Sequence, residues 1–203
     1  MYSVHAMNAD HDMEITLPIL QSIERQSDIT QRSLAKRLGL ALGLTNSYLK
    51  HCINKGLVKI EQIPSNRYLY YLTPKGFAEK SRLTAEYLSR SFRFYRQASD
   101  SCLKIFTDCR LKNWRDVVLC GISELAEIAV LQAAQADINV LGIFDSRAER
   151  NQFLNFSVWR HTSDLPAQAI CVITTLEAPR RTQQELTRHI DMERILAPEI
   201  LGL

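Results

Sequence analysis

The chain has 203 residues, of which 46% are hydrophobic, and a formal net charge of +3. It can bury a substantial core, and its length, which lies between one and two domains, favours two. No apolar run approaches the roughly 20 residues that span a bilayer, and the start MYSVHAMNADHD lacks a signal-peptide pattern, so we expect a cytoplasmic protein. The five cysteines form no CxxC pair, which argues against a disulfide framework or a metal site and predicts small core residues.

Charge is distributed unevenly along the chain. Residues 1–112 contain 17 Lys and Arg against 10 Asp and Glu, whereas residues 113–203 contain 8 against 12. The net charge is therefore +7 in the first part and −4 in the second, and no lysine follows Lys112. A basic amino-terminal part joined to an acidic carboxy-terminal part predicts a DNA-binding module followed by a module of another kind.

The amino-terminal part has the pattern of a small helical module. Residues 1–12 are polar without periodicity and predict a flexible arm, and a first helix is expected from Pro18. Thr30 can cap a second helix, which is amphipathic and ends at Gly39. A third helix follows, and its apolar positions are Thr45, Leu49, Cys52 and Ile53. The second and third helices together predict a helix-turn-helix.

A two-stranded hairpin is predicted directly after the third helix. That helix ends at Lys55 and Gly56, a basic last turn followed by a glycine, and residues 57–63 then alternate as a strand. The sequence PSNR turns the chain, and residues 68–72 return as the second strand. Such a wing after a helix-turn-helix is typical of a DNA-reading module, which we assign to residues 13–76.

The segments QRSLAKRLG, NKGLV and YLYYLTPKG occur in this order along the module. Together they resemble winged helix-turn-helix transcriptional regulators of the MarR type, most closely the small members associated with exopolysaccharide gene clusters. The resemblance covers about residues 14–109. It implies a transcriptional regulator that binds double-stranded DNA. Ala41 lies where such proteins often place a polar N-cap.

The polar side of the third helix is expected to contact DNA. Amide, hydroxyl, imidazole and ammonium groups on that side can meet base edges or phosphates. One further basic residue lies at the hairpin tip, and two lie on the helix that crosses the DNA backbone. The predicted DNA-binding residues are Arg32, Lys36, Asn46, Ser47, Lys50, His51 and Arg67. The alternative is a solvated polar face without a partner.

A long helix follows the wing and is assigned to residues 77–112, after a cap at Thr73. Seven-residue steps along it give two rows of apolar or small side chains, a seam of about four heptads. The rows are Ser81, Leu88, Tyr95, Cys102 and Cys109, and Ala85, Phe92, Ser99 and Phe106. We expect a homodimer through residues 81–109, since an operator with paired half-sites requires two recognition helices. Alternatively, the seam packs against the second domain of its own chain.

The pattern changes after residue 112 to alternating strands and helices. The predicted elements are strand 116–120, a turn at 121–123, helix 124–134, strand 138–144, strand 169–174, helix 180–189 and a short strand near 194–196. They predict a Rossmann-like domain over residues 113–203, with a parallel sheet of four or five strands and helices on both faces. The chain as a whole is therefore expected to be an α/β protein.

The turn after the first of these strands is a degenerate form of the dinucleotide motif. Gly121, Ser123 and Ala126 occupy its three glycine positions, and Asp145 lies where an acid would bind a ribose diol. Glu124 and a second acid in the same helical turn would repel a pyrophosphate, which argues against a full dinucleotide. The predicted cofactor-binding residues are Gly121, Ser123, Asp145 and Thr174.

The segment GISELAEIAVLQA is similar to small Rossmann-like domains attached to sugar-modifying acyltransferases and methyltransferases. This resemblance implies a nucleotide or sugar-nucleotide effector, whose binding would change how two recognition helices are presented to DNA. Two alternatives remain: a ligand-free structural domain, or a nucleotide-dependent enzyme with an appended winged helix. Neither a nucleophile with an adjacent base nor paired carboxylates can be identified, so we expect no catalytic residues.

Overall fold

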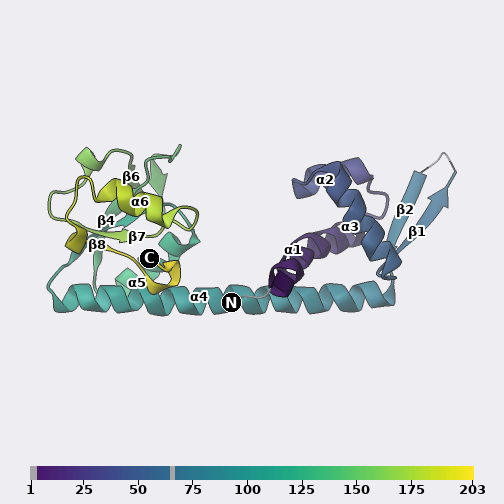
Figure 1. Cartoon of the computed structure of the whole chain (residues 1–203), viewed down its shortest axis with the longest axis horizontal. Helices are drawn as coiled ribbons and strands as arrows, with labels where there is room; N and C mark the ends of the chain where they lie inside the picture. The colour runs from purple at the N-terminus through teal and green to yellow at the C-terminus, as the bar shows by residue number, and fades with distance from the viewer. Residues whose placement is uncertain (1–3, 65–66) are drawn as a thin grey trace. The chain divides into compact units, whose positions relative to one another are not determined.

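In the computed structural model of the chain, residues 4–64 and 67–203 are described, residues 4–12 by their backbone alone. The chain divides into two compact units, Met1–Arg90 and Ser91–Leu203 (Figure 1). Helices dominate the first unit and a mainly parallel sheet the second, which agrees with the predicted mixed α/β class. None of the helices in the described residues has the length and apolar content of a membrane span.

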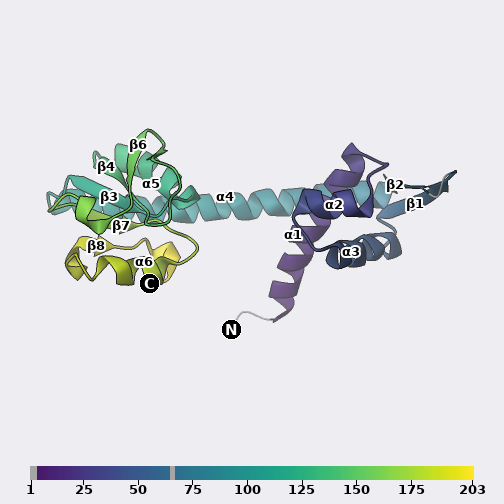
Figure 2. The ribbon, with the colours of Figure 1, turned by 90° about the horizontal axis from the view of Figure 1, so that it is seen from above.

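The described residues of the first unit form three helices, a hairpin and the beginning of a long fourth helix (Figures 1 and 2). Its elements are α1 (Val4–Arg25), α2 (Gln31–Leu38), α3 (Leu42–Asn54), β1 (Val58–Ile63), β2 (Arg67–Leu72) and the first part of α4 (Pro74–Leu111). Leu20 of α1, Leu34 of α2, Leu49 of α3 and Tyr70 of β2 are buried in one core. The helix-turn-helix and its wing are thus one packed module.

Helix α1 differs from its prediction at the amino-terminal end. It begins at Val4 and contains Pro18, so residues 4–12 are helical where the sequence predicts a flexible arm. Buried side chains on both sides of the proline, among them Leu17 and Ile19, anchor the helix in the core. Their packing offsets the backbone hydrogen bond that a proline cannot donate.

The ends of α2 and the wing agree with the sequence prediction. The side chain of Thr30 accepts a hydrogen bond from Ser33 N–H at 3.1 Å, and Gly39 ends the helix with a φ of 65°. Strands β1 and β2 pair antiparallel. The hydroxyl of Thr73 accepts from Gly76 N–H at 3.0 Å and so caps α4 as expected. A Cβ atom at Gly76 would lie 2.0 Å from Leu57 O, so only glycine lets α4 start this close to the wing.

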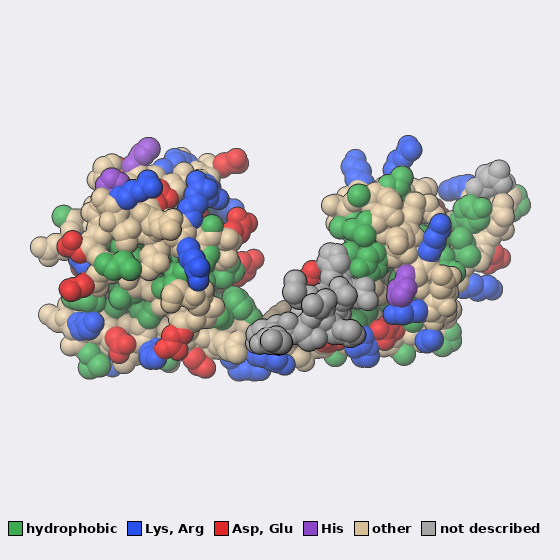
Figure 3. All heavy atoms as spheres, viewed as in Figure 1, with side chains coloured by type: hydrophobic (Ala, Val, Ile, Leu, Met, Phe, Trp, Pro, Cys, Tyr) green, Lys and Arg blue, Asp and Glu red, His purple; other side chains and the backbone are tan. Residues whose placement is uncertain are grey.

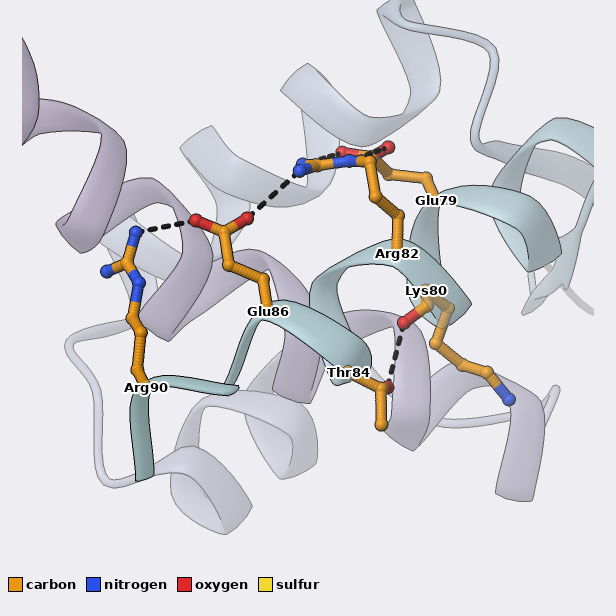
Figure 4. A network of polar contacts seen from close by, with 6 residues as sticks. All are labelled: Glu79, Lys80, Arg82, Thr84, Glu86 and Arg90. Atoms are coloured by element: carbon orange, nitrogen blue, oxygen red, sulfur yellow. Dashed lines mark hydrogen bonds and ion pairs between the residues drawn. The ribbon is translucent and has the colours of Figure 1, made fainter. Parts of the chain in front are cut away.

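Charged side chains line α4 beyond its first turn (Figure 4). Arg82 donates to both oxygens of Glu79, at 2.8 and 2.9 Å, and to Glu86 at 2.9 Å, while Arg90 donates to Glu86 at 2.6 Å. The hydrogen bond from Arg82 lowers the pKa of Glu79. Pairs at these spacings stabilise a helix by about 0.3–0.5 kcal/mol each. These pairs support α4 between residues 79 and 90, and none of residues 84–97 is buried.

The second unit is an open sheet covered by helices on both faces. Its further elements are β3 (Asp116–Cys120), α5 (Glu124–Gln135), β4 (Asn139–Phe144), β5 (Gln152–Phe153), β6 (Phe156–Trp159), β7 (Ile170–Ile173), α6 (Pro179–Leu186) and β8 (Ile195–Leu196). The strand order is β5-β6-β4-β3-β7-β8, and the strands from β6 to β8 are parallel. Strand β3, the first of the unit, therefore lies inside the sheet between β4 and β7.

The side chains of β3 alternate between two cores. Val117 and Leu119 pack with α5 and the last part of α4, whereas Val118 and Cys120 pack with Leu186 of α6. A strand that is buried on both faces reads as an uninterrupted apolar run, which is why DVVLC could be recognised as a strand.

The sheet has six strands, where the sequence predicted four or five parallel ones. The addition is β5, which pairs antiparallel with β6 at the sheet edge. Leu154 and Asn155 join the two strands with φ angles of 48° and 67°, as a two-residue type I′ hairpin turn requires. A strand of two residues is too short to show a hydrophobic period, so this hairpin escaped the sequence prediction.

The last part of α4 packs on the sheet of its own chain. Cys102, Phe106 and Cys109, which belong to the two predicted rows, are buried in one core with Val117 and Leu119. The predicted dimer seam is therefore wrong for residues 98–109, where the contact is intramolecular. Leu88, Phe92 and Tyr95 of the same rows are exposed.

Candidate nucleic-acid interface and ligand cavity

Helix α3 presents polar side chains on the face away from its core. Ser47, Lys50 and His51 are exposed, as the helical spacing predicts. Asn46 is half-buried, and its side-chain oxygen is buried without a hydrogen-bond partner among the described residues. It follows the buried Thr45 directly and lies at the border of the apolar side, so its oxygen does not belong to the exposed reading face.

Basic side chains flank α3 on its neighbouring elements. Arg32 and Lys36 are exposed on α2, and Arg67 is exposed at the start of β2. The guanidinium of Arg67 lies 3.9 Å from the Asp28 carboxylate, and an exposed ion pair of this length holds the side chain only weakly. Figure 3 shows more basic than acidic side chains over this unit and a mixture of both over the sheet unit.

The first turn of α3 is apolar and exposed, a feature that the sequence prediction missed. Leu42 and Leu44 are 43% and 37% exposed, with Gly43 between them. Ala41 is the N-cap and makes no side-chain hydrogen bond, so the missing polar cap is confirmed. The sequence feature that points to exposed leucines is the run LGLALGL at residues 38–44. It contains more leucines than the buried sides of two short helices can cover.

A cavity of about 250 Å³ lies at the carboxyl ends of the central strands of the sheet unit. Its lining comes from the segments that follow β3, β4 and β7 and from the first part of α6. The order of the strands reverses here, because β4 follows β3 on one side and β7 follows on the other. Ligands of open α/β sheets bind at such a switch point. Gly121, Ser123 and Asp145, which the sequence predicted, all line the cavity.

Gly121 has a conformation that only glycine adopts easily. Its φ is +113°, and a Cβ atom would lie 2.4 Å from the Cβ of Thr175 and 2.6 Å from Thr175 N. Gly121 N–H donates to Phe144 O at 2.8 Å. The glycine is therefore required by packing of the turn against the end of β7, and it offers no spare amide to a phosphate.

Ser123 and Thr174 fasten the same turn. The hydroxyl of Ser123 accepts from Leu125 and Ala126 N–H as the N-cap of α5, and it donates to Thr174 O at 2.5 Å. The Thr174 hydroxyl is buried and donates to Gly121 O at 2.6 Å. Of the predicted ligand set, Thr174 is thus placed behind the turn and does not line the cavity.

Asp145 ties the end of β4 to the same turn. One carboxylate oxygen accepts from Ile122 N–H and the other from Arg147 N–H, both at 3.0 Å. Because a carboxylate oxygen has two lone pairs, each can accept one more hydrogen bond from a ligand hydroxyl. The structure therefore gives Asp145 a supporting role that the sequence alone did not indicate.

The charged lining of the cavity was only partly predicted. Glu124, Glu177 and Glu185 add three carboxylates to that of Asp145, and Arg147 and Arg181 contribute two guanidinium groups. Helix α6 has no acidic residue in its first turn, where Arg181 lies, in contrast to α5. A single anionic group is accommodated better beside α6 than beside α5. Arginines on a helix far along the chain could not be assigned to this cavity without the fold.

The cysteines are buried, free thiols, as predicted. Burial raises the pKa of Cys102 to about 12 and that of Cys109 to about 11, so both stay protonated at neutral pH. The residues that the structure describes contain no group of three or more His, Cys, Asp or Glu side chains that could hold a metal ion.

Comparison with known proteins identifies the first unit. Residues 14–59 match the family described as winged helix-turn-helix DNA-binding. The chain therefore contains a DNA-binding domain of the winged-helix class. No curated protein matches it at a significant level. MepR, a transcription regulator of the Staphylococcus aureus multidrug efflux pump MepA, is similar over 48% of this chain and 84% of that chain, with 18% identity and a TM-score of 0.36.

Proposed function

We propose that the chain is a transcriptional regulator of the MarR type, which binds double-stranded DNA through α3 and the wing. The match of residues 14–59 to a DNA-binding family carries this proposal. The exposed Ser47, Lys50 and His51 on α3 support it, as does Arg67 beside the wing tip. Such groups contact base edges and phosphates when a recognition helix lies in the major groove.

The test measures duplex affinity at several salt concentrations by fluorescence anisotropy. Lys50→Ala should weaken binding and lower the slope of log affinity against log salt by about 1, the contribution of one phosphate contact. Arg110→Ala is the control, since it removes an exposed basic residue at the far end of α4. Equal effects of the two changes would show a loss of general charge and would contradict the assignment of α3.

We further propose that two copies associate through the exposed part of α4. Leu88, Phe92 and Tyr95 are 45%, 59% and 44% exposed and continue the predicted rows where the intramolecular contact ends. Replacing Leu88 and Phe92 by Glu would place two carboxylates in this contact, where an unpaired charge is costly. Sedimentation should then show a folded monomer, whereas Gln97→Glu, which adds a charge off the rows, should leave a dimer.

The second unit is proposed to be a Rossmann-like effector domain. Counted along the unit, its parallel strands lie in the order third, second, first, fourth and fifth, as in dinucleotide-binding folds, with the cavity at the switch point. A volume of about 250 Å³ is below the roughly 300–1,000 Å³ of most ligand pockets. It suits part of a nucleotide or sugar nucleotide better than a whole dinucleotide.

The ligand proposal is tested by thermal unfolding with a panel of nicotinamide, adenine, flavin and sugar nucleotides. Trp114 and Trp159, the two tryptophans of the chain, both belong to the second unit, so their fluorescence follows it selectively. A ligand that binds the folded unit should raise its melting temperature. Arg181→Ala should abolish the rise, while the adjacent Arg180→Ala, which is exposed and does not line the cavity, should retain it. No rise with any compound would favour a structural domain.

A further inference from the structure

We infer that Leu42 and Leu44, in the first turn of α3, contact the 5-methyl groups of thymines in the major groove. The inference rests on the proposed DNA binding and adds a sequence preference to it. Both leucines lie within the range that matches a DNA-binding family. They also lie at the amino-terminal end of the recognition helix, the end whose residues reach base edges in helix-turn-helix proteins.

The fold leaves a large part of these two side chains exposed. Leu42 and Leu44 are 43% and 37% exposed, whereas Leu49, the next leucine of the same helix, is buried at 2%. Two large apolar side chains exposed within three residues lose solvent contact only when a partner covers them. Neither helix capping nor core packing explains why leucine stands at these two positions. Ala41 is the N-cap, and Thr45 is the first buried residue of the helix.

Gly43, between the leucines, gives a second and independent indication. A Cβ atom there would meet nothing within 4 Å, and its φ lies outside the region that favours glycine. The fold would therefore accept alanine, which is the better helix former by about 0.5–1 kcal/mol. A bare backbone at this position leaves room for another molecule to approach closely.

The exposed turn is continuous with the polar face of α3. Gly43, Ser47, Lys50 and Asn54 follow one another at helical spacing and are all exposed. Leucine cannot hydrogen-bond to the acceptors and donors of guanine, cytosine or adenine. Thymine alone presents a methyl group in the major groove, and apolar side chains read it by contact. DNA that lies along this face would thus meet the leucines next to the polar groups, and we expect them to select A·T pairs.

The experiment starts from a random pool of duplexes, from which the full chain selects its preferred sites. Each selected duplex is then prepared with uracil in place of thymine, one position at a time, which removes only the methyl group. Affinity should fall about fourfold at the contacted positions, the factor for one buried methyl-sized group. The double variant Leu42→Ala and Leu44→Ala should bind the thymine and uracil duplexes equally well.

Two control variants separate the outcomes. Lys50→Ala should weaken binding to both duplexes and keep the methyl dependence, while Leu111→Ala, at another exposed leucine, should change neither. Equal affinity of the unchanged chain for thymine and uracil at every position would overturn the inference and leave the proposed function intact. Failure to select any duplex would overturn both. A leucine variant that alters sedimentation instead would overturn the inference, because the turn would then contact a second copy of the chain.

Discussion

The starts of α3 and α5 show two ways of building the first turn of a helix. At α5, Ser123 caps two backbone amides, Asp145 binds a third, and the preceding Gly121 is enclosed by the end of β7. At α3, Ala41 caps nothing, and the side chains of Leu42 and Leu44 are exposed. The backbone amides at the start of α5 are hydrogen-bonded within the fold, so we call this turn closed. The start of α3 has no side-chain cap and two exposed leucines, so we call this turn open.

This difference separates residues needed for stability from residues available for binding. A closed turn resists substitution, because every change breaks a hydrogen bond or creates a clash. An open turn tolerates substitution, and its cost appears only when a partner binds. In a regulator of this kind, we therefore expect mutations at α5 to lower stability and mutations at α3 to change DNA binding.

The largest contrast is expected between two glycines. Gly121→Ala should destabilise the sheet unit by about 2–4 kcal/mol, because φ is +113° and the new Cβ would overlap Thr175. Gly43→Ala should leave stability unchanged or raise it by up to about 1 kcal/mol. Urea unfolding measures the first by tryptophan fluorescence and the second by circular dichroism. A large loss from Gly43→Ala would contradict the open turn.

A smaller contrast is expected between the two caps. Ser123→Ala removes the acceptor for Leu125 and Ala126 N–H and should cost about 1–2 kcal/mol in the sheet unit. Ala41→Ser supplies a cap that α3 lacks and should stabilise the winged helix by about 0.5–1 kcal/mol. Urea unfolding measures both changes in stability, by tryptophan fluorescence for the sheet unit and by circular dichroism for the winged helix. Stabilisation by Ser123→Ala would mean that the turn is strained and that the Ser123 hydroxyl contributes little to its hydrogen bonding.

The smallest effects concern exposed side chains. Glu127 lies in the first turn of α5, where a carboxylate interacts favourably with the helix dipole, so Glu127→Gln should cost about 0.3–1 kcal/mol. Raising the salt concentration should reduce that cost, since the interaction is screened. Leu44→Ala should change stability by less than about 0.5 kcal/mol. A larger effect of Leu44→Ala would place this leucine in the core of the winged helix.

The winged helix could be predicted well because its signals are local. Thr30, Gly39, Gly56 and Thr73 each mark an end or a start within a few residues, and the structure bears out their positions. The start of α1 was missed because Pro18 resembles a boundary, and only packing around it shows that the helix continues. The exposed leucines were missed because the surplus of leucines in the run LGLALGL does not show which of them stay exposed.

In the sheet unit, the features that depend on contacts between distant residues could not be predicted from the sequence. Most strands were found from their apolar runs, but their order and the β5–β6 hairpin depend on pairing between distant residues. The hydrogen bonds of Asp145 and Thr174 likewise join segments more than 20 residues apart. Period-seven spacing in α4 could not distinguish a contact with the chain's own sheet from a contact with a second copy. Burial of Phe106 settles this for the last part of the helix only.

Amide hydrogen exchange of the full chain, with and without a selected duplex, tests the central claim most directly. Exchange should slow in peptides that cover Leu42–Asn54 and Arg67–Leu72, because DNA would cover the recognition helix and the wing. Peptides over Glu124–Gln135 should exchange at the same rate in both samples. Protection of α5 together with unchanged exchange in α3 would contradict the account, because the closed turn would then be the one that binds DNA.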